Sequence, residues 1–190
     1  MGRRDKAQQV AVTALTTLES GLGSAIPAQL SIYGALLQTS AVVAARRGDR
    51  AGANEFLTEA GVVARRLGED RNDFWTVFGP TNVGIHRASV AVELGDAGRV
   101  VEQARAIDSS RLPSLERRAH HLLDLAQGYG QWRKDYQALD ALLHAERLAP
   151  QEVHQQPTVQ RLVVELLQRE RRTTKPHLRE LATRVGVLAA

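Results

Sequence analysis

The sequence predicts an all-α protein built from antiparallel helix hairpins stacked side by side, with about eight or nine helices. The composition favours helices, because Ala, Leu, Arg, Glu and Gln are abundant and aromatic residues make up only 4% of the chain. Apolar residues recur at three- and four-residue spacing. Short breaks such as Gly48–Asp49 and Gly95–Asp96 separate these segments and indicate tight turns between paired helices.

Helix starts and stops can be placed in order along the first third of the chain. A first helix covers residues 4–19, where the apolar side chains keep helical spacing. Pro27 suits the first turn of a second helix, because its φ is preset and it has no N–H to leave unpaired. That helix runs to about Arg47. A third helix, near residues 50–67, ends at Gly68.

The same reasoning places the later helices. Their predicted starts lie near Pro80, Ser114, Asp135, Pro157 and Pro176. Another helix, lined by Val100, Ala104 and Ile107, follows the break at Gly95–Asp96. Together these elements predict one domain. It consists of an N-terminal helix (1–24), three repeats (25–68, 69–111 and 112–150) and C-terminal capping helices (151–190).

An internal repeat supports this division. Ala41, Ala88 and Ala126 occupy equivalent places in three first helices and lie 47 and 38 residues apart. The tetratricopeptide repeat has a period of about 34 residues. The chain therefore predicts a tetratricopeptide-like right-handed stack, in which neighbouring hairpins bury each other's apolar faces. The extra residues between the first two copies form the segment 68–79. An irregular bundle of the same helices is the alternative.

Composition and charge exclude several classes of protein. The chain has no cysteine, so disulfides and thiolate chemistry are excluded. The start of the chain does not resemble a secretory signal, and the apolar segments predict no membrane span, so we expect a cytoplasmic protein. The net charge of +4 resides entirely in residues 161–190. A solvated helix face explains this basic tail, and contact with nucleic acid is the alternative.

A polar stripe on the central helix is the leading candidate for a binding site. Asn82, His86 and Ser89 fall at i, i+4 and i+7, which places them on one helix face. First helices of stacked hairpins line a concave surface, which adds residues from the neighbouring repeats. The candidate groove comprises Gln38, Trp75, Phe78, Asn82, His86, Ser89, His120, Asp124, Gln127 and Gln131. Such a groove would bind a peptide or small molecule; a wet surface without a ligand is the alternative.

The segment Arg71–Asn72–Asp73–Phe74–Trp75 just before this helix has two interpretations. It is either a specificity loop or a structural clasp, in which Asp73 caps a helix and the aromatic side chains fill the seam between repeats. The clasp is favoured, because large aromatic side chains are usually buried.

Signatures of enzymes and metal sites are not found in the sequence. It contains no Gly-rich phosphate loop, no GxSxG elbow and no thiol nucleophile. His120 and His121 are adjacent, so on a helix they point about 100° apart and do not share one ion easily. His120 and Asp124 read as a surface hydrogen-bonded pair. We therefore predict no catalytic residue, no metal and no cofactor.

Four segments carry a resemblance to a known family: LSIYGALLQTSAVVAARRGDR (30–50), RRLGEDRNDFWTVFGPTNVGIHRASVAVELGD (65–96), LPSLERRA (112–119) and HAERLAPQEV (144–153). The chain resembles the C-terminal tetratricopeptide-like region of actinobacterial helix-turn-helix regulators of the XRE type. The resemblance implies a regulatory domain that binds a small-molecule or peptide effector and forms a homodimer. It also implies that DNA is bound only through a helix-turn-helix domain not present in this sequence. A standalone protein-interaction scaffold is the alternative, and a nucleic-acid binder using the basic tail is a weaker one.

Overall fold

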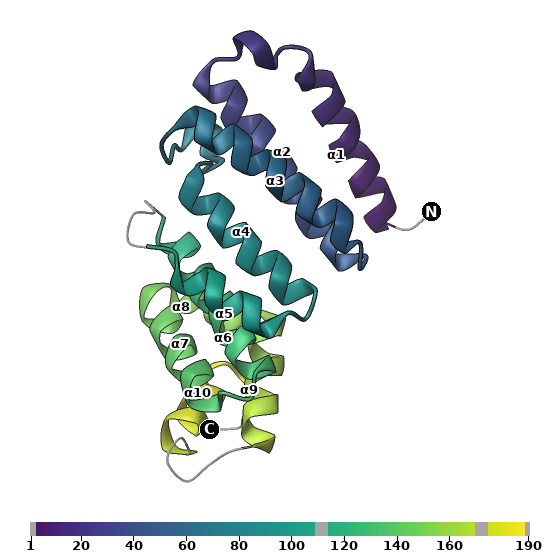
Figure 1. Ribbon diagram of the computed structural model, residues 1–190. Coiled ribbons are helices and arrows are strands. Elements are labelled where there is room, and N and C mark those ends of the chain that lie inside the picture. Colours follow the sequence, from purple (N-terminus) through teal and green to yellow (C-terminus); the bar gives the residue numbers. More distant parts are fainter. Residues whose placement is uncertain (1–2, 109–113, 170–174, 189–190) are drawn as a thin grey trace. The chain divides into compact units, whose positions relative to one another are not determined.

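The chain folds entirely into helices in the parts that are described. The computed structural model describes residues 3–108, 114–169 and 175–188, which form ten α-helices and two short 3₁₀ helices (Figure 1). This confirms the all-α prediction. The chain divides into two compact units, Met1–Leu94 and Gly95–Ala190.

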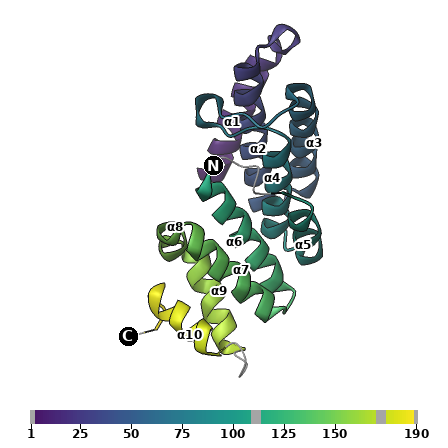
Figure 2. The same cartoon turned by 90° about the vertical axis from the view of Figure 1, so that its left-hand side faces the viewer.

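Unit 1 contains four α-helices, of which α2 is the central one. The helices are α1 (Arg3–Glu19), α2 (Pro27–Arg46), α3 (Arg50–Leu67) and α4 (Pro80–Glu93), with 3₁₀ helices η1 (Leu22–Ser24) and η2 (Asp73–Trp75). Helix α2 packs against α1, α3 and α4, and α3 also packs against α4 (Figures 1 and 2). The turn into α3 is fixed by Asp49, whose carboxylate accepts a hydrogen bond from the Gly52 amide at 2.9 Å.

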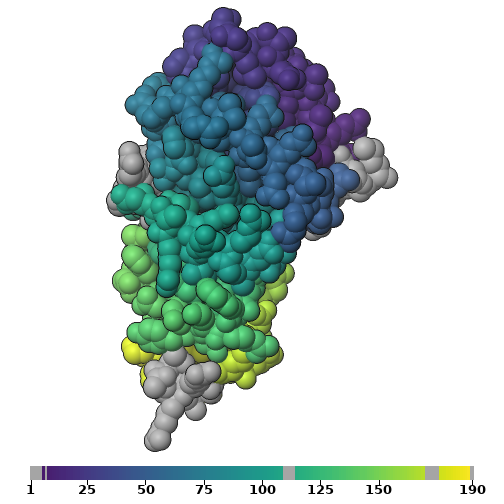
Figure 3. Space-filling view, in the orientation of Figure 1, coloured from purple at the N-terminus to yellow at the C-terminus, as the bar shows by residue number. Residues whose placement is uncertain are grey.

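The core of unit 1 combines small and large side chains. Near one end of α2, Leu37 and Phe78 are fully buried. Near the other end, Ala41 and Ala53 are fully buried and allow α2 and α3 to approach closely. In the space-filling view, side chains of the first helices, purple to blue, fill the spaces seen between the ribbons (Figure 3).

Helix α2 is also long and apolar enough to cross a membrane, although the sequence predicted no such segment. It has 20 residues and a mean hydropathy of 1.2, because no charged residue occurs between Glu19 and Arg46. However, 56% of its most apolar window is buried against the rest of the protein. The core helix of a soluble protein has the same properties, so α2 is weak evidence for a membrane span.

Unit 2 contains six α-helices. They are α5 (Ala97–Arg105), α6 (Leu115–Gln131), α7 (Asp135–Leu148), α8 (Pro150–Gln155), α9 (Pro157–Gln168) and α10 (Lys175–Arg184). Helix α6 packs against α5 and α7, and α9 packs against α10. The described helices exceed the expected eight or nine because Pro150 opens a short helix instead of only ending α7. Pro157 then opens the next helix, since each proline suits a first helical turn.

The division into units differs from the expected single domain of three repeats. Each described hydrophobic core cluster lies within one unit: two between Leu15 and Val90, and one between Val101 and Val185. The expected second repeat, 69–111, is split between the units at Leu94. Its expected boundary at residues 111–112 lies outside the described residues.

Candidate functional site

Three of the expected groove residues belong to the core of unit 1. Asn82 is fully buried, and its amide nitrogen donates a hydrogen bond to the side-chain oxygen of Gln38 at 3.1 Å. Gln38 is 2% exposed and Phe78 is fully buried. These side chains therefore do not open onto a groove, and the expectation that they do is wrong. The stripe on α4 misleads because this helix packs against both α2 and α3, so a polar residue there can face a neighbouring helix.

The other two residues of the stripe are half-buried. The Nδ1 atom of His86 lies 3.0 Å from the backbone oxygen of Asn82, one turn earlier in α4. Ser89 is half-buried as well. The stripe thus runs from the core at Asn82 towards the surface at Ser89, and does not form a continuous polar wall.

The expected groove residues of α6 lie nearer the surface of unit 2. His120 is exposed; its ring nitrogens lie 3.5 Å from a Glu152 carboxylate oxygen and 3.3 Å from the Gln156 amide nitrogen. Asp124 and Gln127 are half-buried, and Gln131 is exposed. Along this face, α6 is bordered by the chain from α8 into α9.

Gln127 and Gln131 line a small polar hollow together with residues of α9. Its volume is about 110 Å³, and the remaining lining residues are Thr158, Arg161, Leu162 and Glu165. Leu162 is 6% exposed and forms the apolar floor. Arg161 and Glu165 make no hydrogen bond or ion pair with any residue that the structure describes. The side chains of Arg161 and Glu165 therefore offer a cation and an anion to a small polar molecule, beside the amides of Gln127 and Gln131.

The loop before α4 carries the two most exposed aromatic side chains of unit 1. Phe74 is 72% exposed and Trp75 is 86% exposed. We refer to residues 69–79 as the aromatic loop. Phe74, Trp75 and Val77 have φ values of 49°, 62° and 48°. Side chains clash with the backbone in this left-handed region, at a cost of roughly 1–2 kcal/mol per residue.

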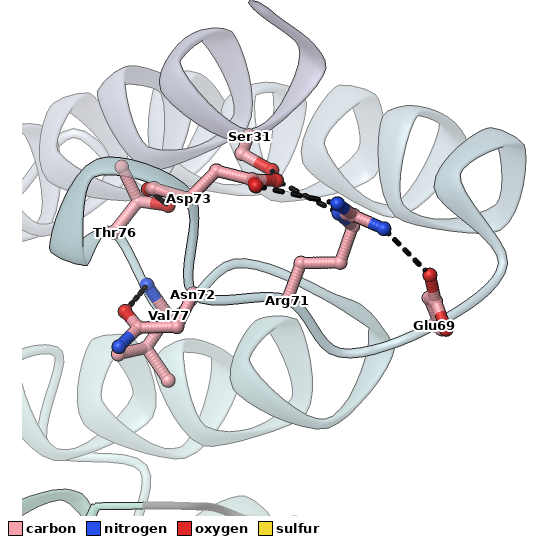
Figure 4. A network of polar contacts seen from close by, with 7 residues as sticks. All are labelled: Ser31, Glu69, Arg71, Asn72, Asp73, Thr76 and Val77. Atoms are coloured by element: carbon pink, nitrogen blue, oxygen red, sulfur yellow. Dashed lines mark hydrogen bonds and ion pairs between the residues drawn. The ribbon is translucent and has the colours of Figure 1, made fainter. Parts of the chain in front are cut away.

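Charged side chains fasten the aromatic loop to α2 (Figure 4). The Arg71 guanidinium donates to both Asp73 carboxylate oxygens, at 2.8 and 3.3 Å, and to Glu69 at 2.8 Å. Asp73 also accepts a hydrogen bond from the Ser31 hydroxyl of α2 at 3.0 Å. The hydrogen bonds from Arg71, and then that from Ser31, hold the pKa of the Asp73 carboxyl below its usual range.

Both ends of the loop are also held. The Asp70 carboxylate accepts hydrogen bonds from the backbone and hydroxyl of Thr81, at 2.9 and 2.5 Å, and so caps α4. The Arg71 amide donates to the Phe78 carbonyl at 2.9 Å. Gly79 passes so close to Asp70 that an added Cβ would lie 2.5 Å from its Cα.

The loop is fastened, but not by the contacts that the clasp interpretation expected. Asp73 pairs with Arg71 and Ser31, while Asp70 caps the helix. Of the three aromatic residues in the aromatic loop, Phe78 is buried, whereas Phe74 and Trp75 face solvent. The prediction that the aromatic pair fills a seam is wrong. A fastened loop that holds a strained backbone and exposes two large aromatic side chains is suited to binding a partner.

Sequence reasoning missed Ser31, Arg161 and Glu165. Ser31 sits in the apolar stretch of α2, where nothing marks it as the partner of a loop 42 residues away. Arg161 and Glu165 belong to the segment that the sequence predicts to be a basic, solvated tail. One signal for the last two residues is present in the sequence. Pro157 marks the start of α9, so the polar face of that helix can be compared with the polar face of α6.

No family model, curated protein or solved structure matches the chain. Among the described residues, no three His, Asp or Glu side chains converge as a metal site would require.

Proposed function

We propose that this chain is a partner-binding regulatory domain, of the kind that controls an attached or associated transcription regulator in the cytoplasm. The exposure of Phe74 and Trp75 carries the proposal. Exposed large aromatic side chains are costly in water and are enriched at the centres of protein interfaces. The clasp holds the backbone that carries both side chains before a partner arrives, which lowers the entropy lost on binding.

The helical architecture is compatible with a tetratricopeptide-like stack. Helices α2 and α3 pack as a hairpin, as do α6 and α7. The three small residues used to detect the repeat, Ala41, Ala88 and Ala126, are all fully buried. Such repeats serve mainly as binding surfaces. The four sequence segments that resemble XRE-type regulators favour a regulatory role over that of a standalone scaffold.

Photo-crosslinking inside the cells in which the protein naturally occurs tests partner binding directly. A photoreactive amino acid is placed at position 75 and, as a control, at position 136, where Tyr136 of unit 2 is 67% exposed. We expect a discrete crosslinked protein from position 75 only. In parallel, the double substitution Phe74→Ser/Trp75→Ser is expected to change transcript levels without loss of helicity. If position 75 gives no discrete crosslink and transcription is unchanged, the proposal fails.

A second candidate activity, effector binding, rests on the polar hollow between α6 and α9. Arg161 could hold a carboxylate and Glu165 an ammonium group, with Gln127 and Gln131 as further hydrogen-bond partners. The volume of about 110 Å³ suits a small zwitterion or part of a peptide.

Thermal stabilisation by free amino acids and dipeptides tests this activity. A ligand that binds only the folded state raises the melting temperature in a saturable manner. Arg161→Gln should abolish such a shift, while Arg147→Gln, on the exposed surface of α7, should leave it unchanged. A shift that survives Arg161→Gln would place the ligand elsewhere.

A further inference from the structure

The turn between α6 and α7 in unit 2 concentrates exposed aromatic and cationic side chains. Trp132 is 47% exposed and Tyr136 is 67% exposed, although large aromatic side chains are usually buried. Arg133 and Lys134 lie between them in the sequence and are exposed as well. We refer to residues 132–136 as the α6–α7 turn. None of these residues lines the polar hollow, and the aromatic loop belongs to unit 1.

The backbone of this turn is strained at a position where another hairpin of the chain has glycine. Arg133 has a φ of 57°, and outside the aromatic loop every other described residue with a positive φ is a glycine. In the α2–α3 turn, the amides of Gly48 and Asp49 bond to the carbonyls three and five residues earlier. The amides of Arg133 and Lys134 make the same two bonds, so Arg133 stands where the α2–α3 turn has Gly48.

Lys134 likewise stands where the α2–α3 turn has an acidic cap. The Asp49 carboxylate accepts a hydrogen bond from the Gly52 amide at 2.9 Å, whereas Lys134 begins α7 without a side-chain cap. Glycine after a helix and aspartate before the next one both stabilise such a turn. The α6–α7 turn lacks both residues and has two cations in their place. Strain and lost caps that add charge to an exposed surface are typical of a binding site.

The exposed charge of the turn is positive. Asp135 is its acidic residue, but the Asp135 side chain is 14% exposed, and one of its carboxylate oxygens lies 3.4 Å from the Arg169 guanidinium of α9. Arg133 and Lys134 make no ion pair with any residue that the structure describes. The Lys134 ammonium lies 4.5 Å from the centroid of the Trp132 ring, where cation and ring attract each other. Two cations beside an aromatic ring suit an anionic partner that carries flat rings of its own.

We propose that the α6–α7 turn binds single-stranded nucleic acid. Bases stack on Trp132 and Tyr136, and the backbone phosphates pair with Arg133 and Lys134. Proteins that bind single strands without sequence preference combine these two features, aromatic stacking and a cationic surface along the backbone. The inference goes beyond the proposed function, because it assigns a second kind of partner to the other unit of the chain.

The dimensions and composition of the turn fit this partner. Consecutive Cα atoms are about 3.8 Å apart, so those of Trp132 and Tyr136 lie within roughly 15 Å of each other. A single strand covers this distance in a few nucleotides, since stacked bases repeat at about 3.4 Å. Residues 131–137 contain no aliphatic side chain, whereas a segment that enters a lipid bilayer usually carries leucine or phenylalanine beside its tryptophan. The composition therefore favours a nucleic acid over a membrane surface.

Fluorescence anisotropy of the full chain with labelled RNA and DNA strands of about 12 nucleotides tests the proposal. We expect single strands to bind more tightly than a duplex of the same sequence. Trp132→Ala and Tyr136→Ala each remove a stacking surface and should weaken binding by roughly five- to a hundredfold. Tyr136→Phe keeps the ring and should retain the affinity. Phe74→Ser/Trp75→Ser removes exposed aromatic side chains of unit 1 and is the matched control, which should bind as the wild type does.

Salt dependence tests the two cations. Lys134→Gln should reduce the slope of log affinity against log salt concentration by about 0.7, the value for one phosphate contact of a single strand. Arg133→Gly should reduce the slope equally but raise the melting temperature, because glycine adopts a φ of 57° without strain. Weaker binding by a more stable protein identifies Arg133 as a binding residue and excludes loss of folding as the cause.

Three results overturn the proposal. The first is an affinity unchanged by both Tyr136→Ala and Arg133→Gly. The second is binding that depends only on Arg171→Gln/Arg172→Gln, which would place the nucleic acid on the basic tail. The third is Trp132-dependent binding to anionic lipid vesicles without binding to oligonucleotides, which would make the turn a membrane contact. Nucleic acid at this turn yields no discrete crosslinked protein from position 136, so that position stays a valid control for the aromatic loop.

Discussion

The burial of several single residues in this protein is the reverse of what their residue type suggests. Gln38 and Asn82 are polar yet buried, whereas Phe74 and Trp75 are aromatic yet exposed. In both cases a specific contact offsets part of the unfavourable placement, although Nε2 of Gln38 and Oδ1 of Asn82 stay buried without a hydrogen-bond partner among the described residues. The buried amides bond to each other, and the exposed aromatic pair is held by the clasp around Asp73. Substitutions at these positions should therefore have effects opposite to those that residue type alone suggests.

Replacement of Gly34 by alanine should destabilise unit 1. A Cβ at this position would lie 2.0 Å from Cζ of the fully buried Phe78 ring. Because neither α2 nor the ring can move freely, we expect a loss of about 1–3 kcal/mol in the free energy of unfolding, measured with urea. Gly61→Ala in α3 is the matched control. There the Cβ would meet only the flexible ends of Arg87, at 3.0 Å, and Arg65, at 3.6 Å. Equal effects of both substitutions would contradict this packing.

The buried pair of Gln38 and Asn82 should show strong coupling. Gln38→Leu or Asn82→Leu alone leaves one amide buried without its partner, which costs about 1–3 kcal/mol. With both replaced, no unpaired amide remains, so the double variant should be nearly as stable as the wild type. Urea unfolding of the three variants measures the cycle. Additive losses would show that the hydrogen bond contributes little.

At the scale of the helices, α10 is attached to α7 through the carboxylate of Glu146. Glu146 of α7 accepts two hydrogen bonds from Arg184 at the end of α10, at 2.8 and 2.7 Å. His154 of α8 lies 2.7 Å from the same carboxylate. The Glu146 side chain is 12% exposed. The hydrogen bonds from Arg184, and then that from His154, lower the pKa of Glu146 although burial opposes them.

This attachment should weaken in acid. A carboxyl whose pKa is lowered in the folded state stabilises the fold above its unfolded pKa, which is 4.5 for glutamate, and ceases to do so as pH falls through the lower folded value. Glu146→Gln should therefore cost roughly 1 kcal/mol at pH 7 and progressively less below pH 4.5. Thermal unfolding from pH 7 to 3 measures the difference. Glu102→Gln, an exposed residue of α5, should show no such dependence.

The helices of this protein could be predicted from the sequence far better than its binding surfaces. Pro27, Pro80 and Pro157 begin helices α2, α4 and α9, as their fixed φ indicates. Which face of α4 is buried could not be predicted, because polar residues at helical spacing can equally face water or a neighbouring helix. The exposure of Trp75 could not be predicted either, since it depends on a hydrogen bond between Ser31 and Asp73 that links distant segments.

At the scale of the whole molecule, the chain forms two units instead of one continuous core. The described apolar clusters of unit 1 extend from Leu15 to Val90, and that of unit 2 extends from Val101 to Val185. The aromatic loop belongs to unit 1, whereas the polar hollow belongs to unit 2. The two proposed activities can therefore be separated by dividing the chain between Leu94 and Gly95.

Each unit should fold by itself. A unit of 94 or 96 residues is close to the common size of a domain, and the described core residues of each unit pack against one another. We expect separately produced fragments 1–94 and 95–190 to be helical by circular dichroism and to unfold cooperatively. A fragment 1–94 that unfolds without a cooperative transition would contradict the independence of its core.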